Sequence, residues 1–366
     1  MADLRKLALS TGGGDAPGLN AVIRAATIAA IERGWECYGI REGYNGLLQP
    51  ERFPTGGLIP LTRDSVRGIT HLGGTILGTT NRGNPLRFPT LVNGQAGEVD
   101  RTDELVARIE ACGLDALIAI GGDSSMAIAD VLGQKGVRVV GVPKTIDNDL
   151  EQTVVTFGFD TAVAFATECL DRLHSTAQAH QRVIVVEVMG RNVGWIALNA
   201  GVAGTAHVIL IPEIPYDLTR VAAALQARFA RGRHYALMVV AEGARPIDGA
   251  VVARAAEAGH AEKLGGVGEQ VAEQLRALTA FDLRTVTLGH LLRGGTPTSF
   301  DRLLSLRFGA AAVRALADGH TGVMVALDPP TVKHVPFAEV SGRLKRVPLD
   351  SDTMVTAREI GICFGD

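Results

Sequence analysis

The stretch Pro143-Lys-Thr-Ile-Asp-Asn-Asp149 directly follows the apolar run VRVVGV. Such a run predicts a buried strand, and parallel α/β sheets bind their ligands beyond the carboxyl ends of their strands. Asp147 and Asp149 stand two residues apart, with a hydroxyl at Thr145 and a cation at Lys144. One carboxylate can accept a proton from a substrate hydroxyl while another group helps to hold a metal, a division that suits phosphoryl transfer. The alternative is a pair of acids that only caps the loop.

Apolar runs alternate with alanine-rich amphipathic stretches along the chain, which predicts parallel sheets covered by helices. We expect helices at about 20–33 and 159–177, and strands at KLALST, WECYGI, DALIAI, VRVVGV, RVIVVEVM, ALMVVA and TVTL. Polar loops follow these strands: GGGD, GGDSS, PKTIDND, MGR, AEG and GHLLRGG. The expected fold is therefore α/β, with two Rossmann-like lobes, mostly parallel sheets, helices on both faces and an active site in the cleft between the lobes.

Composition sets the broad class of the protein. The 366 residues are 46% hydrophobic, which is more chain than one core usually organises, so we expect two domains. The net charge is −3 without a block of basic residues, which argues against nucleic acid or a membrane as partner. No apolar run reaches the ~18 residues of a membrane span. The start MADLRKLALSTGGGD lacks a secretory apolar core and the four cysteines are far apart, so we expect free thiols and a cytoplasmic location.

A glycine-rich loop between Thr11 and Asn20, TGGGDAPGLN, follows the first expected strand and opens a helix. Glycines let backbone N–H groups approach phosphate oxygens, and a helix N-terminus favours an anion. A tight turn would need about one glycine, so four within seven residues favour a phosphate site. From Gly12 and Gly14 the third glycine of a dinucleotide fingerprint would fall at Pro17, which argues against a dinucleotide-dependent oxidoreductase. The sequence also has no P-loop motif.

The loop Gly121-Gly-Asp-Ser-Ser125 combines the same glycines with a carboxylate. Asp123 could hold Mg²⁺ directly or through water. Because Asp and Ser are also favoured helix caps, a purely structural role is an equal alternative for this loop alone.

Four arginines stand at the edges of apolar strands, where guanidinium groups can bind phosphate in a bidentate way. They are Arg182, Arg191, Arg284 and Arg293. A single arginine is usually a solvated surface charge, but four beside glycine or histidine favour a phosphate pocket. His290 and Glu242 are uninformative alone, although Glu242 could accept sugar hydroxyls.

Seven motifs, in chain order, resemble those of the 6-phosphofructokinases. They are GGGDAPGLNAVIR (12–24), GGTILG (73–78), IGGDSS (120–125), PKTIDND (143–149), HQRVIVVEVMGR (180–191), AEG (241–243) and LGHLLRGGTPTSFDR (288–302). The resemblance covers nearly the full length. It implies a two-lobed α/β fold and transfer of a phosphoryl group from ATP, with Mg²⁺, to the 1-hydroxyl of fructose 6-phosphate, a glycolytic step that gives fructose 1,6-bisphosphate.

The resemblance also implies roles for single residues. The catalytic set would be Asp147 as the base, with Thr145, Lys144 and Arg191. Asp123 would be the metal-site acid, within a donor site of Gly14, Arg82, Gly122, Asp123, Ser124 and Ser125. The sugar phosphate would meet Thr145, Asp147, Asp149, Arg182, Met189, Gly190, Arg191, Glu242, Arg284, His290 and Arg293. Arg182 and Arg284 match arginines that reach in from a neighbouring subunit, so the resemblance implies a homo-oligomer, either a dimer or a tetramer.

The phosphoryl donor is the point at which the sequence departs from the family pattern. Members that use ATP commonly have Gly after the GGD aspartate, whereas pyrophosphate users have Asp there and Lys before the TIDND threonine. This chain has Ser124 and Lys144 at these two positions. A small neutral serine does not repel an α-phosphate, which favours ATP over the alternative, pyrophosphate. Asn81 also stands where short members have arginine, so Arg82 serves only if the loop shifts by one residue.

A catalytically silent sensor of phosphosugars or nucleotides is an alternative of another class. Such a protein could lose Asp123 or Asp147 and keep the arginines, and the presence of both acids favours an enzyme.

The order of the motifs predicts lobes made from discontinuous segments. We expect residues 1–158 and about 292–342 in a donor-binding lobe, and residues 159–291 and about 343–366 in a sugar-phosphate-binding lobe. The tail 341–366 resembles the end of a longer bacterial subgroup that includes both donor types, and we expect a helix there that packs on the second lobe.

Overall fold

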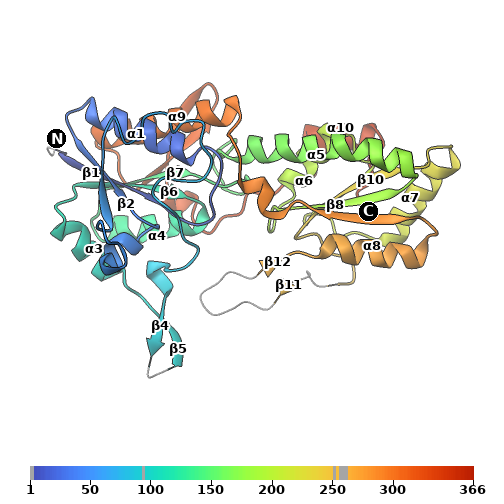
Figure 1. Cartoon of the computed structure of the whole chain (residues 1–366), viewed down its shortest axis with the longest axis horizontal. Coiled ribbons are helices and arrows are strands. Elements are labelled where there is room, and N and C mark those ends of the chain that lie inside the picture. Colours follow the sequence, from blue (N-terminus) through green and yellow to red (C-terminus); the bar gives the residue numbers. More distant parts are fainter. Residues whose placement is uncertain (1–3, 93–94, 250–252, 255–262) are drawn as a thin grey trace.

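Two open sheets lie side by side and form the framework of the molecule (Figure 1). The structure is a computed structural model that describes residues 4–92, 95–249, 253–254 and 263–366. The larger sheet has the strand order β15 (Thr331–Pro336), β14 (Val323–Asp328), β7 (Val139–Pro143), β6 (Ala116–Gly121), β1 (Lys6–Thr11), β2 (Glu36–Ile40), β3 (Leu58–Leu61). The smaller sheet has the order β13 (Leu283–Thr287), β8 (Val183–Val188), β10 (Ala236–Ala241), β9 (Val208–Leu210).

The inner strands of the larger sheet are parallel, and its outer strands β3 and β15 run antiparallel to their neighbours. One face packs against α1 (Leu19–Ile31) and α9 (Ser299–Ala317), and the other against α3 (Thr102–Ala111) and α4 (Asp123–Gln134). Along β1, Leu7 and Leu9 belong to the hydrophobic core under α1 and α9, whereas Ala8 belongs to the core under α3 and α4. This alternation, which a strand imposes on its side chains, buries the sheet on both faces.

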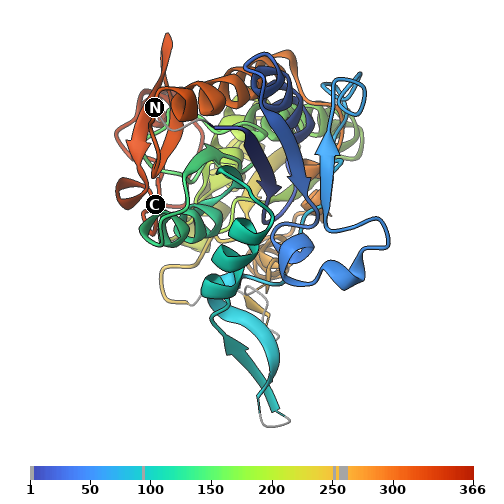
Figure 2. The same ribbon diagram turned by 90° about the vertical axis from the view of Figure 1, so that its left-hand side faces the viewer.

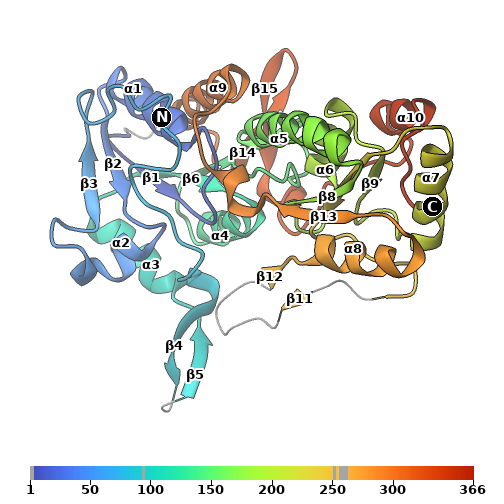
Figure 3. The same ribbon diagram turned by 45° about the vertical axis from the view of Figure 1, so that its right-hand side comes forward.

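The smaller sheet is parallel throughout and is also covered on both faces. On one side lie α5 (Phe159–His180), α6 (Trp195–Ala203) and α10 (Asp352–Glu359), and on the other α7 (Leu218–Ala230) and α8 (Val267–Leu278). Figure 3 shows α5 and α8 on opposite sides of β8 and β13. The α/β fold class predicted from the sequence is confirmed, and the expected helix in the tail is α10, which packs on α6.

Shorter elements complete the described part of the chain. They are α2 (Asn45–Leu48), the 3-10 turns Pro50–Arg52, Pro85–Arg87, Gly289–Arg293 and Phe337–Glu339, and the hairpins β4 (Phe88–Val92) with β5 (Gln95–Val99) and β11 (Ala253–Arg254) with β12 (Lys263–Leu264). The β4–β5 hairpin projects away from the body of the molecule (Figure 2). None of the helices in the described ranges is long and apolar enough to cross a membrane. The four cysteines are free, as expected.

The strand order of the larger sheet reverses between β1 and β6. From β1 the chain passes outward to β2 and β3, and it then returns to β6 on the other side of β1. Open α/β sheets bind ligands at such a reversal, beyond the carboxyl ends of the strands. Here the Gly12 amide donates a hydrogen bond to Ile120 O at 3.0 Å, which joins the two strand ends. The GGGD and GGDSS loops therefore meet where a ligand is expected.

Helices α1 and α9 cross closely because Gly309 has no side chain. A Cβ at Gly309 would lie 2.6 Å from Val22 O and 2.9 Å from the Cβ of Ala25. Gly309→Ala should therefore destabilise the protein by ~1–3 kcal/mol through overpacking, despite the ~1 kcal/mol gain in helix propensity. Gly133→Ala in α4 is the matched control, since its Cβ would meet nothing nearer than 3.6 Å. Melting temperatures should fall for the first variant and stay or rise for the second, and equal shifts would contradict the argument.

Candidate active site

The acidic loop after β7 is buried and held by its own polar groups. Thr145 Oγ1 accepts a hydrogen bond from the Asp147 amide at 3.0 Å, and Thr156 Oγ1 donates to Thr145 O at 2.7 Å. Asn148 has a left-handed φ of 54°, which asparagine tolerates better than most residues. Its Oδ1 accepts from the Thr156 amide at 3.1 Å. Asn148 therefore turns the backbone between the two predicted carboxylates.

Asp147 is only 4% exposed, and its Oδ1 is buried without a hydrogen-bond partner in the described part of the chain. Burial and the nearby charge of Asp149 raise its pKa to about 7, against the opposing effect of Arg293 and Arg191. A carboxylate that titrates near neutral pH and keeps one oxygen unpaired can act as a general base.

Asp149 and Asp123 form the acidic side of the site. Burial is the main cause that raises the pKa of Asp149, and the charge of Asp123 raises it further. A hydrogen bond from Thr145 and the charge of Arg191 act in the opposite direction. Carboxylates that repel one another in a buried place favour the binding of a cation.

The glycine loop after β1 meets a buried lysine and a half-buried arginine. Lys144 Nζ donates a hydrogen bond to Gly14 O, and Arg293 Nη1 donates to Asp15 O at 3.3 Å. A Cβ at Gly14 would lie 2.7 Å from Arg293 Nη1, so a side chain there would displace the guanidinium group from the loop. Burial and the charge of Arg293 lower the pKa of Lys144 to about 8. Arg293, which the sequence assigned to the sugar phosphate, thus lies against the loop assigned to the donor.

The N-terminus of α4 forms the second wall of the predicted donor site. The helix begins at Asp123 with Gly122 as its N-cap residue, so Asp123 lies inside the first turn. Ser125 is buried, and a Cβ at Gly121 or Gly12 would collide with its Oγ, at 2.0 and 2.8 Å. Ser124 is exposed at the same helix start. Its hydroxyl can therefore reach a ligand, whereas that of Ser125 packs against the glycines.

The loop after β8 contributes groups from the smaller sheet. Met189 is half-buried, and Gly190 and Arg191 have positive φ angles of 148° and 49°. The Arg191 amide donates to Glu242 Oε1 at 3.0 Å. Burial raises the pKa of Glu242, which the Arg191 and Gly190 amides oppose. A Cβ at Gly243 would lie 1.9 Å from Arg191 O, so the glycine of the AEG motif allows the two loops to meet.

Two predicted residues lie away from this cluster. Arg182 and Arg284 both pair with Asp282, Arg182 at 2.5 Å, near the starts of β8 and β13. That is the opposite end of β8 from Met189, seven residues and roughly 23 Å away at about 3.3 Å per residue. His290 and Arg82 are exposed.

Sequence reasoning missed two contacts from the tail. The Gly342 amide donates to Asp123 Oδ1 at 2.8 Å, and Lys345 Nζ donates to Asn148 Oδ1 at 3.0 Å. The only local signal was the run of basic residues in SGRLKR, which reads as a solvated surface.

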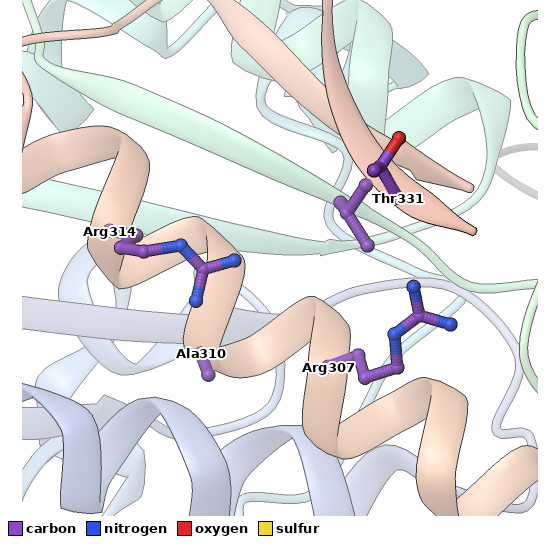
Figure 4. A pocket seen from close by; sticks show the side chains of 5 residues that line it. Arg307, Ala310, Arg314 and Thr331 are labelled. Atoms are coloured by element: carbon purple, nitrogen blue, oxygen red, sulfur yellow. The ribbon is translucent and has the colours of Figure 1, made fainter. Parts of the chain in front are cut away.

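A surface cavity of about 460 Å³ lies elsewhere, between α9 and β15. It is lined by Arg307, Ala310, Arg314, Thr331 and Val332 (Figure 4). None of these residues belongs to the predicted site.

Comparisons with known proteins identify the family of this chain. A family profile described as Phosphofructokinase matches residues 6–316. The ATP-dependent 6-phosphofructokinase of Chloroflexus aggregans is 51% identical over 362 residues, which cover 99% of this chain and 98% of the relative. The pyrophosphate–fructose 6-phosphate 1-phosphotransferase of Streptomyces coelicolor is 46% identical, over 98% of this chain and 100% of the relative. The solved phosphofructokinase of Pichia pastoris in the T-state has a TM-score of 0.77 and 30% identity, and the match covers 93% of this chain but 35% of that longer chain.

A glycine loop at a helix start, opposite a buried acidic loop in an α/β fold, defines a phosphotransferase-type enzyme. The chain belongs to the phosphofructokinase family, as the profile match and the 51% identity show.

The pKa of Asp147 can be measured directly. In an NMR titration with carbon-13 in the aspartate carboxyls, the Asp147 resonance is identified by its absence from the Asp147→Asn variant. That resonance should titrate with a midpoint near pH 7 in the protein without substrate. Asp149→Asn should lower the midpoint because it removes a like charge, and Arg293→Gln should raise it because it removes an opposite charge. A midpoint below pH 5 in the unaltered protein, or shifts of the opposite sign, would refute this account of the site.

Proposed function

We propose that this chain transfers the γ-phosphoryl group of ATP to the 1-hydroxyl of fructose 6-phosphate, giving fructose 1,6-bisphosphate and ADP in glycolysis. The proposal rests on one observation above all. Asp147 has an unpaired, buried oxygen and a pKa of about 7, and the charges of Arg191 and Arg293 act on it from the loops after β8 and β13. The proposed location is the cytoplasm, as predicted from the sequence.

Asp147 acts as the base in this proposal. Its carboxylate accepts the proton of the sugar 1-hydroxyl, the hydroxyl oxygen forms a bond to the γ-phosphorus, and the bond from that phosphorus to the leaving oxygen of ADP breaks. Arg191 and Arg293, whose charges already act on Asp147, offset the negative charge on the phosphoryl oxygens. Thr145 holds the loop in place through the Asp147 amide.

Enzymes of this family generally need a divalent metal ion. No three His, Cys, Asp or Glu side chains in the described ranges are grouped to hold a metal by themselves. This suits Mg²⁺, which proteins usually hold through one or two carboxylates together with water and substrate phosphates. We propose Asp123 and Asp149 for this role, since their mutual repulsion is relieved by a cation. When bound, the metal offsets negative charge on the transferred phosphoryl group.

We assign the donor to the lobe of residues 1–158 and about 292–342, and the sugar phosphate to that of residues 159–291 and about 343–366. Gly14, Lys144 and the start of α4 support the first assignment, because they surround the reversal between β1 and β6. The sugar site is then formed by Met189, Gly190, Arg191, Glu242, His290 and Arg293.

We infer a homodimer or homotetramer in which Arg182 and Arg284 serve the site of a neighbouring subunit. Both side chains lie near the starts of β8 and β13, the opposite end of these strands from Met189, and are held by the shared carboxylate of Asp282. A pair of guanidinium groups fixed in this way is preorganised to bind a phosphate.

The choice of donor follows from the surroundings of two residues. Ser124 is exposed at the start of α4 and carries no charge that would repel an α-phosphate. Lys144 is buried and donates to Gly14 O, so it holds the glycine loop. Pyrophosphate is the second candidate, because the 46% identical Streptomyces coelicolor relative is named for it.

The base can be removed without changing the shape of the side chain. Asp147→Asn should lower kcat about 10²–10⁴-fold, because an amide cannot accept the hydroxyl proton. The KM for fructose 6-phosphate should stay within a few-fold. Asp64→Asn, at an exposed position remote from the site, is the control. Steady-state rates test this prediction, and an unchanged kcat in Asp147→Asn would show that Asp147 is not the base.

Initial rates with each donor test the proposed function itself. ATP should support phosphorylation of fructose 6-phosphate at least tenfold better than pyrophosphate. Ser124→Asp should lower kcat/KM for ATP more than tenfold, since like charges brought together cost several kcal/mol. Ser124→Asn, similar in size but neutral, should have a much smaller effect. Activity with pyrophosphate and none with ATP would reverse the choice of donor, and no activity with either would refute the proposed function.

A further inference from the structure

The segment of residues 341–347 lies beyond the 6–316 range of the family profile, yet it runs along the acidic loop. The Lys345 amide donates to Asp149 O at 3.0 Å, and Leu344 forms a β-bridge with Leu150. The segment therefore pairs with the chain directly after the two predicted carboxylates.

Lys345 directs all three hydrogens of its ammonium group at this loop. Nζ donates to Asn148 Oδ1 at 3.0 Å, to Thr153 O at 2.9 Å and to Val154 O at 2.9 Å. Burial lowers the pKa of Lys345 to about 8, and the charges of Glu151 and Asp149 oppose this effect. A surface lysine gains little from such contacts, but a largely buried one is held in one geometry.

Asn148 makes this contact relevant to the reaction. It stands between Asp147 and Asp149 with a φ of 54°, and its Oδ1 accepts from both Lys345 and the Thr156 amide. A strained backbone residue keeps its conformation only when its surroundings hold it. Rotation at Asn148 would redirect both neighbouring carboxylates, and misplacement by about 1 Å can cost about 100-fold in rate.

The same segment is fixed at both ends. The Gly342 amide donates to Asp123 Oδ1 at 2.8 Å. On the side of the smaller sheet, Trp195 Nε1 donates to Lys345 O at 2.9 Å, and the Val347 amide donates to Glu213 Oε1 at 3.0 Å. The segment thus connects the predicted metal-site acid, the acidic loop and the start of α6.

We propose that Lys345 is a positioning residue for the phosphoryl-transfer reaction, which holds Asn148 so that Asp147 and Asp149 keep their reactive orientation. The proposal rests on the function proposed above. It assigns to residues 341–347 a part in setting kcat, in addition to packing between the lobes.

A double-mutant cycle separates positioning from packing. Lys345→Met keeps the length of the side chain without its charge, and Asn148→Gly keeps the left-handed backbone without the acceptor. Each variant should lower kcat about 10–100-fold with the KM for fructose 6-phosphate within about twofold. The kcat of the double variant should be little lower than that of the more impaired single variant, because both substitutions remove the hydrogen bond between Lys345 and Asn148. Arg346→Ala, an exposed cation next to Lys345, is the control and should match the unaltered protein.

A second measurement does not depend on activity. Amide hydrogen exchange at Thr156, which donates to Asn148 Oδ1, should be slow in the unaltered protein and at least tenfold faster in Lys345→Met. If the unaltered protein does not phosphorylate fructose 6-phosphate, the proposed function fails, while the exchange data still show whether Lys345 holds the loop. Unchanged exchange would then overturn the positioning role.

Three kinetic results would overturn the proposal. They are an unchanged kcat with only a lower melting temperature, a raised KM with an unchanged kcat, and fully multiplicative losses in the double variant. If Lys345→Met does not fold, Asn148→Gly decides alone, since it leaves the bonds of Lys345 to Thr153 and Val154 in place.

Discussion

The burial of an incompletely paired carboxylate is the constraint on which the rest of this structure depends. Asp147 has one oxygen without a hydrogen-bond partner in the described part of the chain, and an isolated buried charge costs several kcal/mol. The charges of Arg293 and Arg191 offset part of that cost, and a pKa near 7 lets the group shed its charge. These arginines follow β13 and β8, so the smaller sheet stabilises a loop that belongs to the larger one.

Glycines allow this arrangement by removing side chains at the points of closest approach. Without a Cβ at Gly14, the guanidinium of Arg293 can lie against the glycine loop. Without one at Gly243, the loops after β8 and β10 can touch, which brings Glu242 to the Arg191 amide. At Gly243 the facing atom is a backbone oxygen, so glycine is needed there for contact between segments, whereas at Gly14 a side chain would displace the end of Arg293.

Contacts between remote segments also hold the acidic loop itself. Gly342 and Asp123 are 219 positions apart in the sequence, and Lys345 and Asn148 are 197 apart. Because the tail approaches both lobes, movement of one lobe against the other would act on the carboxylates through the same hydrogen bonds. Residues 342 and 345 therefore contact two residues of the candidate site directly.

The sequence by itself determined the α/β class, seven strands of the two sheets and the family, because these follow from apolar periodicity and from glycine and acid motifs within single short segments. It also gave Lys144, Thr145, Asp147 and Asp149 of the acidic loop as candidates, but not Asn148 between the two acids. Only the tertiary structure decided that Arg293 lies against Gly14, that Arg182 and Arg284 lie at the far ends of their strands, and that Lys345 holds Asn148. Those facts depend on which remote segments meet, and local pattern carries no information about the partner of a side chain across the fold.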